Sequence, residues 1–104
     1  MEARLVLVTH PSGDEASALA RTLVQEGVAA CVNIVPNVTS IYRWQGKVEA
    51  DDEALLIIKT RADAITDLEK RVLALHPYDT PEFVVIEPCS VNQRYLSWLL
   101  ASAG

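Results

Sequence analysis

The chain has 104 residues, half of them hydrophobic, and carries a formal charge of −5 at pH 7 with a sequence pI of about 4.9. This length suits a single domain with one core, covering residues 1–104, and the negative charge argues against DNA or RNA as partners, because their binding depends on neutralising phosphates. No apolar run approaches the ~20 residues of a membrane span and the N-terminus lacks the features of a signal peptide, so we expect a soluble cytoplasmic protein without membrane contact.

A strand followed by a helix is predicted at the start of the chain. Residues 4–9 form a nearly continuous apolar run, which is typical of a buried central strand. Residues 16–24 are apolar at helical spacing, and Gly27 stands where a glycine would end the helix. Either Ser12 or Gly13 is placed to cap its start.

The next stretch is predicted to form one long β-hairpin, around which the rest of the chain is organised. Its arms, residues 28–44 and 47–60, are rich in β-branched and aromatic residues near the turn and in aliphatic residues farther along. Gln45 and Gly46 fit a two-residue turn, because Gly46 can adopt a positive φ without a Cβ clash.

This turn sets the register of the hairpin. Trp44 should face Lys47, and regular pairing from there would bring Val32 opposite Lys59, with arms of roughly 40 Å at about 3.3 Å per residue. Pro36 should bend or bulge the first arm, because proline cannot donate to the ladder. Such a hairpin is longer than a compact domain of this size can cover.

The tip of the hairpin is therefore expected to project and to bind another copy of the chain. Four large apolar or aromatic side chains lie near it: Ile41, Tyr42, Trp44 and Val48. An uncovered ribbon of this kind is prone to self-association, and Tyr and Trp are enriched at interfaces. We expect an obligate homo-oligomer with Ile41, Tyr42 and Trp44 in the interface.

The second half of the chain repeats the alternation of helix and strand. Residues 61–75 are apolar at helical spacing, and this helix should end before Pro77 because the residue before a proline avoids the α region. Residues 82–87 are typical of another buried strand, and residues 92–101 of a final helix. The order β-α-β-β-α-β plus a helix predicts an α+β, ferredoxin-like sandwich with both crossover helices on one face of an antiparallel sheet. The terminal helix and neighbouring subunits would cover the other face.

Several stretches over nearly the whole chain carry a family resemblance, namely residues 30–36 (ACVNIVP), 40–47 (SIYRWQGK), 55–60 (LLIIKT), 76–82 (HPYDTPE) and 95–98 (YLSW). In this order they resemble the CutA family of divalent-cation tolerance proteins. The resemblance implies a PII-like, ferredoxin-like subunit assembled as a homotrimer through the long hairpin. It also implies an association with tolerance of copper and other divalent metals in bacteria.

Cys31 and His76 are the candidate ligands for a soft or borderline metal ion such as copper. Each also has a purely structural interpretation: free cysteines are commonly buried as small hydrophobes, and His76 can simply close the helix before it. Cys31 and Cys89 are expected to be free thiols, because neither CxxC spacing nor a secretory context is present. His10 has no obvious partner and is expected to be solvated.

An acidic run on the second hairpin arm could attract hard cations: Glu49, Asp51, Asp52 and Glu53. Strand alternation sends Asp51 and Glu53 to one face and Asp52 to the other, so the run does not form a cage. We expect a solvated edge that discourages aggregation between ribbons.

The connector after the second helix is the other candidate site. In a trimer, Tyr78, Asp79 and Glu82 could meet Arg43 and Lys59 from the hairpin of a neighbour. These residues could form a salt-bridge network that fixes the assembly. They could instead form a cleft for a small anionic ligand, by a fold-level analogy with PII relatives.

No motif for hydrolytic or transfer chemistry is present, so we do not expect an enzyme. A thiol-dependent reaction at Cys31 with His76 as base lacks any oxyanion motif. We expect a trimeric, non-enzymatic protein that binds copper or other divalent metal ions and contributes to metal homeostasis. The alternative is a PII-like signalling or scaffold protein that binds a small effector in the cleft between subunits.

Overall fold

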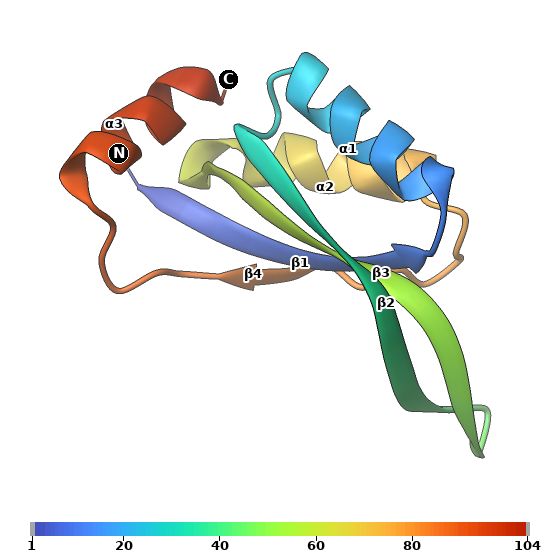
Figure 1. Cartoon of the computed structure of the whole chain (residues 1–104). Helices are drawn as coiled ribbons and strands as arrows, with labels where there is room; N and C mark the ends of the chain where they lie inside the picture. Colours follow the sequence, from blue (N-terminus) through green and yellow to red (C-terminus); the bar gives the residue numbers. More distant parts are fainter. Residues whose placement is uncertain (1, 104) are drawn as a thin grey trace.

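The computed structural model describes residues 2–103 as a four-stranded antiparallel sheet with helices packed against it (Figure 1). The elements in chain order are β1 (Ala3–Pro11), α1 (Asp14–Gln25), β2 (Cys31–Trp44), β3 (Lys47–Arg61), the 3-10 helix η1 (Ala62–Ala64), α2 (Ile65–Leu75), β4 (Val84–Ile86) and α3 (Gln93–Ser102). The strands lie in the order β2-β3-β1-β4, with every neighbouring pair antiparallel. This confirms the predicted α+β, ferredoxin-like fold with an additional C-terminal helix.

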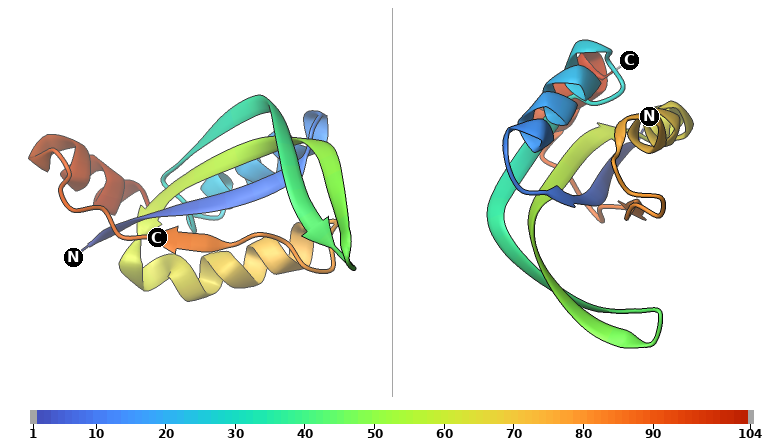
Figure 2. Two further views of the ribbon diagram at one scale, coloured as in Figure 1. Left: turned by 90° about the horizontal axis from the view of Figure 1, so that it is seen from below. Right: turned by 90° about the vertical axis from the view of Figure 1, so that its right-hand side faces the viewer.

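The main core lies between the sheet and the two helices α1 and α2, which pack on the same face (Figures 1 and 2). Alternate residues of β1 and β3 point toward these helices. The large side chains that are completely buried there are Val6, Val8, Leu23, Leu56, Ile58, Leu68 and Val72. Each such burial contributes about 1.5–3 kcal/mol, so this layer supplies most of the hydrophobic stabilisation of the subunit.

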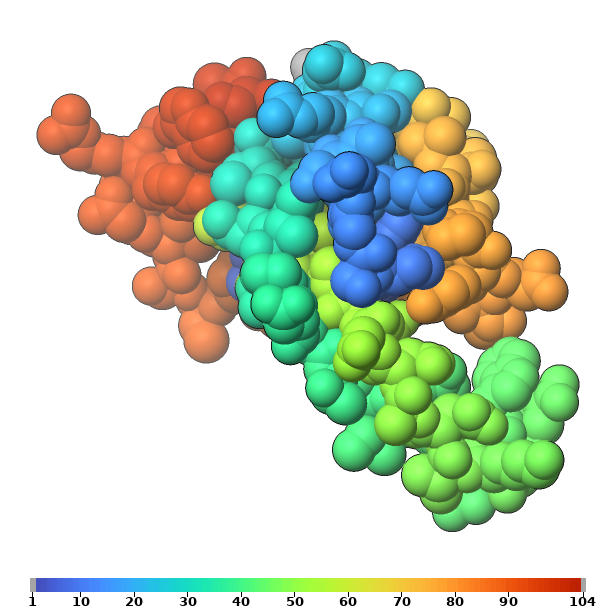
Figure 3. All heavy atoms as spheres, turned by 45° about the vertical axis from the view of Figure 1, so that its right-hand side comes forward, coloured from blue at the N-terminus to red at the C-terminus, as the bar shows by residue number. Residues whose placement is uncertain are grey.

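The hairpin of β2 and β3 extends well beyond this core (Figures 1 and 3). The molecule measures 44 × 27 × 23 Å, and its radius of gyration of 14.2 Å exceeds the about 13 Å of a compact chain of this length. Figure 2 shows that the hairpin curls, with its concave side toward the connector between α2 and β4. The predicted projection of the hairpin tip is confirmed.

The turn of the hairpin is the predicted one. Gln45 and Gly46 have φ values of 51° and 80°, as a type I′ turn requires at both central positions. Trp44 pairs with Lys47, and the predicted register holds down to the pair of Val38 and Glu53.

The register shifts by one residue at the predicted bulge. The irregularity lies between Val35 and Val38, where Pro36 cannot donate to the ladder and Asn37 has a φ of 60°. Beyond the bulge Val32 pairs with Ile58, so the expected pairing of Val32 with Lys59 is wrong.

Both crossover helices end as predicted, but the second begins later than expected. After α1, Gly27 has a φ of 77°, the left-handed conformation that favours glycine. Gly13 is the N-cap of α1. The expected start of the second helix at Arg61 is wrong, because Arg61 still pairs with Ala3 in the sheet and a 3-10 turn precedes α2. His76 then leaves the helical conformation just before Pro77.

The last strand is shorter and more exposed than its apolar sequence suggests. Among residues 2–103, β4 pairs only with β1, at the edge of the sheet, and its three residues are exposed. The expected buried strand over residues 82–87 is therefore wrong, because an edge strand lacks a neighbour on one side.

The terminal helix α3 packs across one end of the sheet. Its start is capped by Asn92, whose side chain accepts hydrogen bonds from the backbone N–H groups of Arg94 and Tyr95. Leu99 is buried with Ala3 and Ala30 in a second, smaller core. The rest of the sheet face opposite α1 and α2, which we call the open face, is only partly covered, with half-buried side chains at Leu5, Leu7 and Ile57.

Candidate functional site

A large pocket lies on the concave side of the hairpin and faces the connector that follows α2. Its volume is about 910 Å³, which is within the range of small-molecule sites. One wall is formed by the hairpin residues Ser40, Ile41, Tyr42, Trp44, Asp51 and Glu53, and the other by residues 77–82. In Figure 3 the hairpin tip stands away from the body beneath this connector.

The pocket is acidic. Four carboxylates line it, from Asp51, Glu53, Asp79 and Glu82, and none of its described lining residues is a lysine or arginine. As predicted from strand alternation, Asp51 and Glu53 lie on the same side of the ribbon. The expectation that the whole acidic run is solvated is wrong for Glu53, which is only 6% exposed.

Two phenols are hydrogen-bonded to these carboxylates. The hydroxyl of Tyr78 donates to Oε2 of Glu53 at 2.9 Å, and the hydroxyl of Tyr42 donates to Asp51. Burial, followed by the bond to Glu53, raises the pKa of Tyr78 to about 12. The hydrogen bond to Asp51 is the main cause that raises the pKa of Tyr42 to about 12. Both phenols therefore stay neutral donors at physiological pH.

Glu82 completes the acidic wall from the connector. Burial, with a smaller contribution from the negative charge of Glu53, raises the pKa of the Glu82 carboxyl above its usual value. The site thus disfavours additional negative charge, and a cation placed between these two carboxylates would relieve their repulsion.

His76 supports the pocket from behind rather than lining it. Its Nδ1 accepts a hydrogen bond from the backbone N–H of Tyr78 at 3.1 Å, so its Nε2 carries the proton and donates to the carbonyl of Thr9 at 2.7 Å. Burial is the main cause that lowers the pKa of this imidazole. Neither ring nitrogen has a free lone pair, so a metal ion could bind His76 only after these bonds break.

His10 is buried beside His76. Its ring lies 4.9 Å from that of His76, between centroids, and its Nδ1 donates to the carbonyl of Pro11 at 2.9 Å. The expected solvation of His10 is wrong, because the residue is 2% exposed. On β1 it shares a face with Val6 and Val8, and that alternation was the signal that could have placed it inside.

The two predicted metal ligands lie far apart. Cys31 is half-buried on β2 and pairs with Lys59 on β3, which in turn pairs with Leu5 on β1. His76 instead bonds to the carbonyl of Thr9 on β1. Leu5 and Thr9 are four residues apart, which corresponds to about 13 Å along the strand. Within residues 2–103, no group of three or more His, Cys, Asp or Glu side chains is arranged to hold a metal ion.

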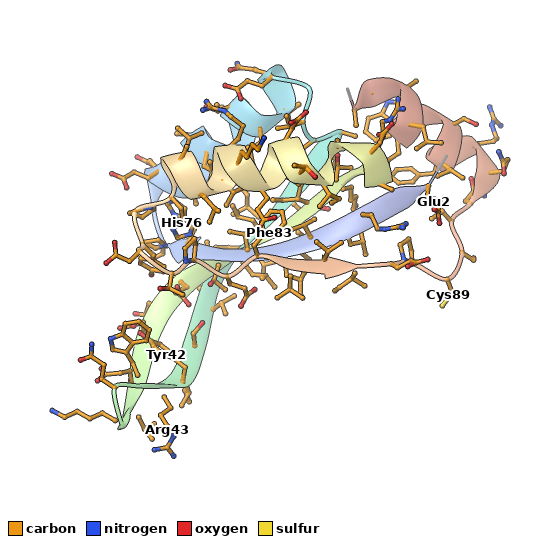
Figure 4. The ribbon with its side chains drawn as sticks, turned by 180° about the vertical axis from the view of Figure 1, so that it is seen from behind. Glu2, Tyr42, Arg43, His76, Phe83 and Cys89 are labelled. Carbon is orange, nitrogen blue, oxygen red and sulfur yellow. The ribbon has the colours of Figure 1, made fainter. Side chains whose placement is uncertain are left out.

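The second cysteine and the two predicted basic residues lie elsewhere. Cys89 is an exposed free thiol between β4 and α3, and Arg43 points away from the body at the hairpin tip (Figure 4). The ammonium of Lys59 lies 5.7 Å from the ring centroid of Tyr95 on α3. Within one chain the predicted cleft residues therefore separate: Tyr78, Asp79 and Glu82 line the pocket, whereas Arg43 and Lys59 do not.

The hairpin tip presents apolar side chains to solvent. Ile41 is 72% exposed, Val48 68% and Trp44 51%. Trp44 and Ile41 also line the pocket, so the predicted interface residues and the pocket share one surface.

Comparisons with known proteins point to a single family. The family described as "CutA1 divalent ion tolerance protein" matches residues 4–102. A relative from Thermus thermophilus, named divalent-cation tolerance protein CutA, is 51% identical over 100 residues, which are 96% of this chain and 97% of the relative. A chloroplastic CutA protein from Arabidopsis thaliana is 46% identical over 91% of this chain, which spans about half (52%) of that protein.

Solved structures of this family share the fold. A divalent cation tolerance protein from Thermus thermophilus superposes with a TM-score of 0.95 at 50% identity, covering 98% of this chain and 99% of the other. CutA1 from Oryza sativa gives a TM-score of 0.97 at 42% identity, covering 100% and 95%. Among residues 2–103, every helix is too short or too polar to cross a membrane.

Proposed function

Because this chain belongs to the CutA1 family of divalent ion tolerance proteins, we propose that it acts in tolerance of divalent cations as a non-enzymatic homotrimer that binds copper or a related metal ion. The family match over residues 4–102 carries the proposal. We also propose a cytoplasmic location, which suits its two free thiols.

The projecting hairpin supports the assembly. Its tip exposes Ile41, Trp44 and Val48, and the open face beside it carries half-buried aliphatic side chains. Contiguous apolar surface of this kind marks protein interfaces. Sister chains seated on the hairpin and the open face would bury both surfaces.

Cys31 is the soft ligand that the proposal retains. Its thiol is partly accessible on β2, and a thiolate suits Cu(I) and Zn(II). His76 is not included, because both of its ring nitrogens are already bonded.

Calorimetric titration with copper and zinc tests the metal site. We expect Cys31→Ser to weaken binding at least about tenfold, whereas Cys89→Ser, which removes the other free thiol, leaves the affinity unchanged. Unchanged affinity of Cys31→Ser would reject Cys31 as the ligand.

The pocket favours a second candidate function, that of a sensor or scaffold that binds a small effector. Its volume of about 910 Å³ and its mixture of aromatic and polar walls are typical of small-molecule sites. In the proposed trimer a neighbouring chain would border the open side of this pocket. Equilibrium binding of a small molecule to the assembled protein, with Cys31→Ser unaffected, would support this function over direct metal binding.

A further inference from the structure

The walls of the pocket combine two features that recognise the same chemical class. Aromatic side chains come from Tyr42, Trp44 and Tyr78, and carboxylates from Asp51, Glu53, Asp79 and Glu82. Aromatic faces attract cations through their quadrupole, and carboxylates attract them directly. An anionic ligand would meet four like charges with no lysine or arginine among the described lining residues to offset them.

We infer that this pocket binds an organic cation, a small molecule bearing an alkylammonium or guanidinium group. The inference rests on the second candidate function above and defines the charge of its effector. It differs from the small anionic ligand expected from fold analogy, which relied on Arg43 and Lys59 of a neighbouring chain; within one chain neither of these residues lines the pocket.

The size of the pocket favours an organic cation over a single metal ion. About 910 Å³ would leave most of the space unfilled around one ion, whereas alkyl groups beside a charged nitrogen would contact the aromatic rings. Ile41 and Pro77 add apolar wall to the same space. A diffuse charge carried by apolar groups matches this mixture of surfaces.

Glu53 provides the fixed negative charge at the inner end. Its carboxylate is buried, and Tyr78 holds Oε2 by a hydrogen bond of 2.9 Å. Among residues 2–103 no fully buried side-chain oxygen lacks a hydrogen-bond partner, so the Oε1 atom, which Tyr78 does not bond, opens toward the pocket and is available to a ligand. Buried charge of this kind is normally paired, and a bound cation would pair it.

Choline tests the inference, with its uncharged carbon isostere 3,3-dimethylbutan-1-ol as the comparison. Binding is followed by NMR on the assembled protein at constant ionic strength, through the indole N–H signals of the only two tryptophans. Trp44 lines the pocket and Trp98 lies on α3. We expect choline to shift the Trp44 signal but not the Trp98 signal, and the isostere to bind at least about tenfold more weakly.

Variants locate the site. Glu82→Gln and Asp79→Asn, which leave the Trp44 signal in place, should each weaken choline binding about 2- to 30-fold. Glu87→Gln, an exposed acidic residue outside the pocket lining, should leave it unchanged. Equal weakening by Glu87→Gln would indicate a general effect of net charge and would overturn the assignment.

Two results would reject the inference outright. One is equal affinity for choline and its isostere; the other is an unmoved Trp44 signal at tens of millimolar choline, as expected if a neighbouring chain fills the pocket. Neither bears on metal binding, which is measured separately by zinc titration of Cys31→Ser. If Cys31→Ser loses zinc binding but retains choline binding, the metal site and the choline pocket are independent, and the inference stands.

Discussion

His76 is the residue whose protonation state is most clearly set by its surroundings. Its ordinary pKa of 6.5 is lowered in the folded chain, and the groups facing it are His10 on β1, Glu53 on β3 and Tyr78 in the connector. Because the unfolded chain binds its proton more readily, the neutral imidazole contributes stability above pH 6.5, and this contribution is lost as the pH falls below 6.5 toward the lowered pKa.

We therefore predict that acid destabilises the protein partly through His76. Urea unfolding at fixed protein concentration should show a loss of stability between pH 7.5 and pH values below 6.5. His76→Gln keeps a donor and an acceptor but does not titrate, so it should flatten this dependence. Glu82 affects the pH dependence of stability with the opposite sign, because its pKa is raised. Both the unmodified chain and His76→Gln contain Glu82, so the difference between their pH profiles removes its effect. An unchanged pH dependence in the variant would contradict the assignment.

The buried carboxylate of Glu53 gives a second prediction for a single residue. Tyr78→Phe removes the donor to Oε2 and should destabilise the chain by about 1–3 kcal/mol, the usual cost of a buried polar group left without its partner. The matched control is Tyr42→Phe, which removes a similar bond to the exposed Asp51 and should cost less than about 1 kcal/mol. Equal losses in urea unfolding would show that burial of Glu53 has no special energetic role.

The burial and the hydrogen-bond partners of His10 and Glu53 were not predicted from the sequence. The alternation along β1 contained the information that His10 points toward the core with Val6 and Val8, but polar side chains are assigned to solvent unless a partner is known. The alternation along β3 places Glu53 on the face opposite to Ala54, Leu56 and Ile58, so its burial could not be predicted from that pattern. The partner of Glu53 is Tyr78, 25 positions away. That contact depends on how the connector after α2 folds back over the hairpin, which local sequence does not specify.

Among the elements, the hairpin turn offers the sharpest test. Gly46 has a φ of 80°, and a Cβ added there would meet nothing within 4 Å, so any cost of Gly46→Ala is conformational. We expect a loss of about 1 kcal/mol in urea unfolding. Gln45 has a φ of 51°, and Gln45→Gly should be neutral or slightly stabilising. A stabilising Gly46→Ala would contradict the assigned turn.

Element types and order followed from hydrophobic periodicity, whereas two details of the sheet did not. Pro36 indicated a bulge, but the direction of its register shift depends on which residues loop out, here between Val35 and Val38. β4 has the apolar composition of a buried strand, yet its position at the edge follows from the complete strand order.

At the scale of the whole molecule, the exposed hairpin tip predicts association between chains. Trp44→Asp should weaken self-association at least about tenfold, because buried aromatic anchors dominate interfaces. Leu73→Asp is the matched control, since Leu73 on α2 is 50% exposed and Trp44 51%, but it lies on the helical side of the sheet. Equal effects of both substitutions on the dissociation constant would contradict a hairpin interface.

The candidate site was only partly predictable because it is assembled from distant parts of the chain. The polar connector indicated Tyr78, Asp79 and Glu82, and these residues line the pocket. Arg43 and Lys59 were expected to reach these residues from the hairpin of a neighbouring chain, so their role depends on the assembly.

The assembly is tested most directly by sedimentation equilibrium of the unmodified chain at micromolar concentration. A homotrimer built on the hairpin predicts a single species of three times the 11.4 kDa of one chain. A stable species of 11.4 kDa would leave the apolar hairpin tip in water and would contradict the proposed assembly.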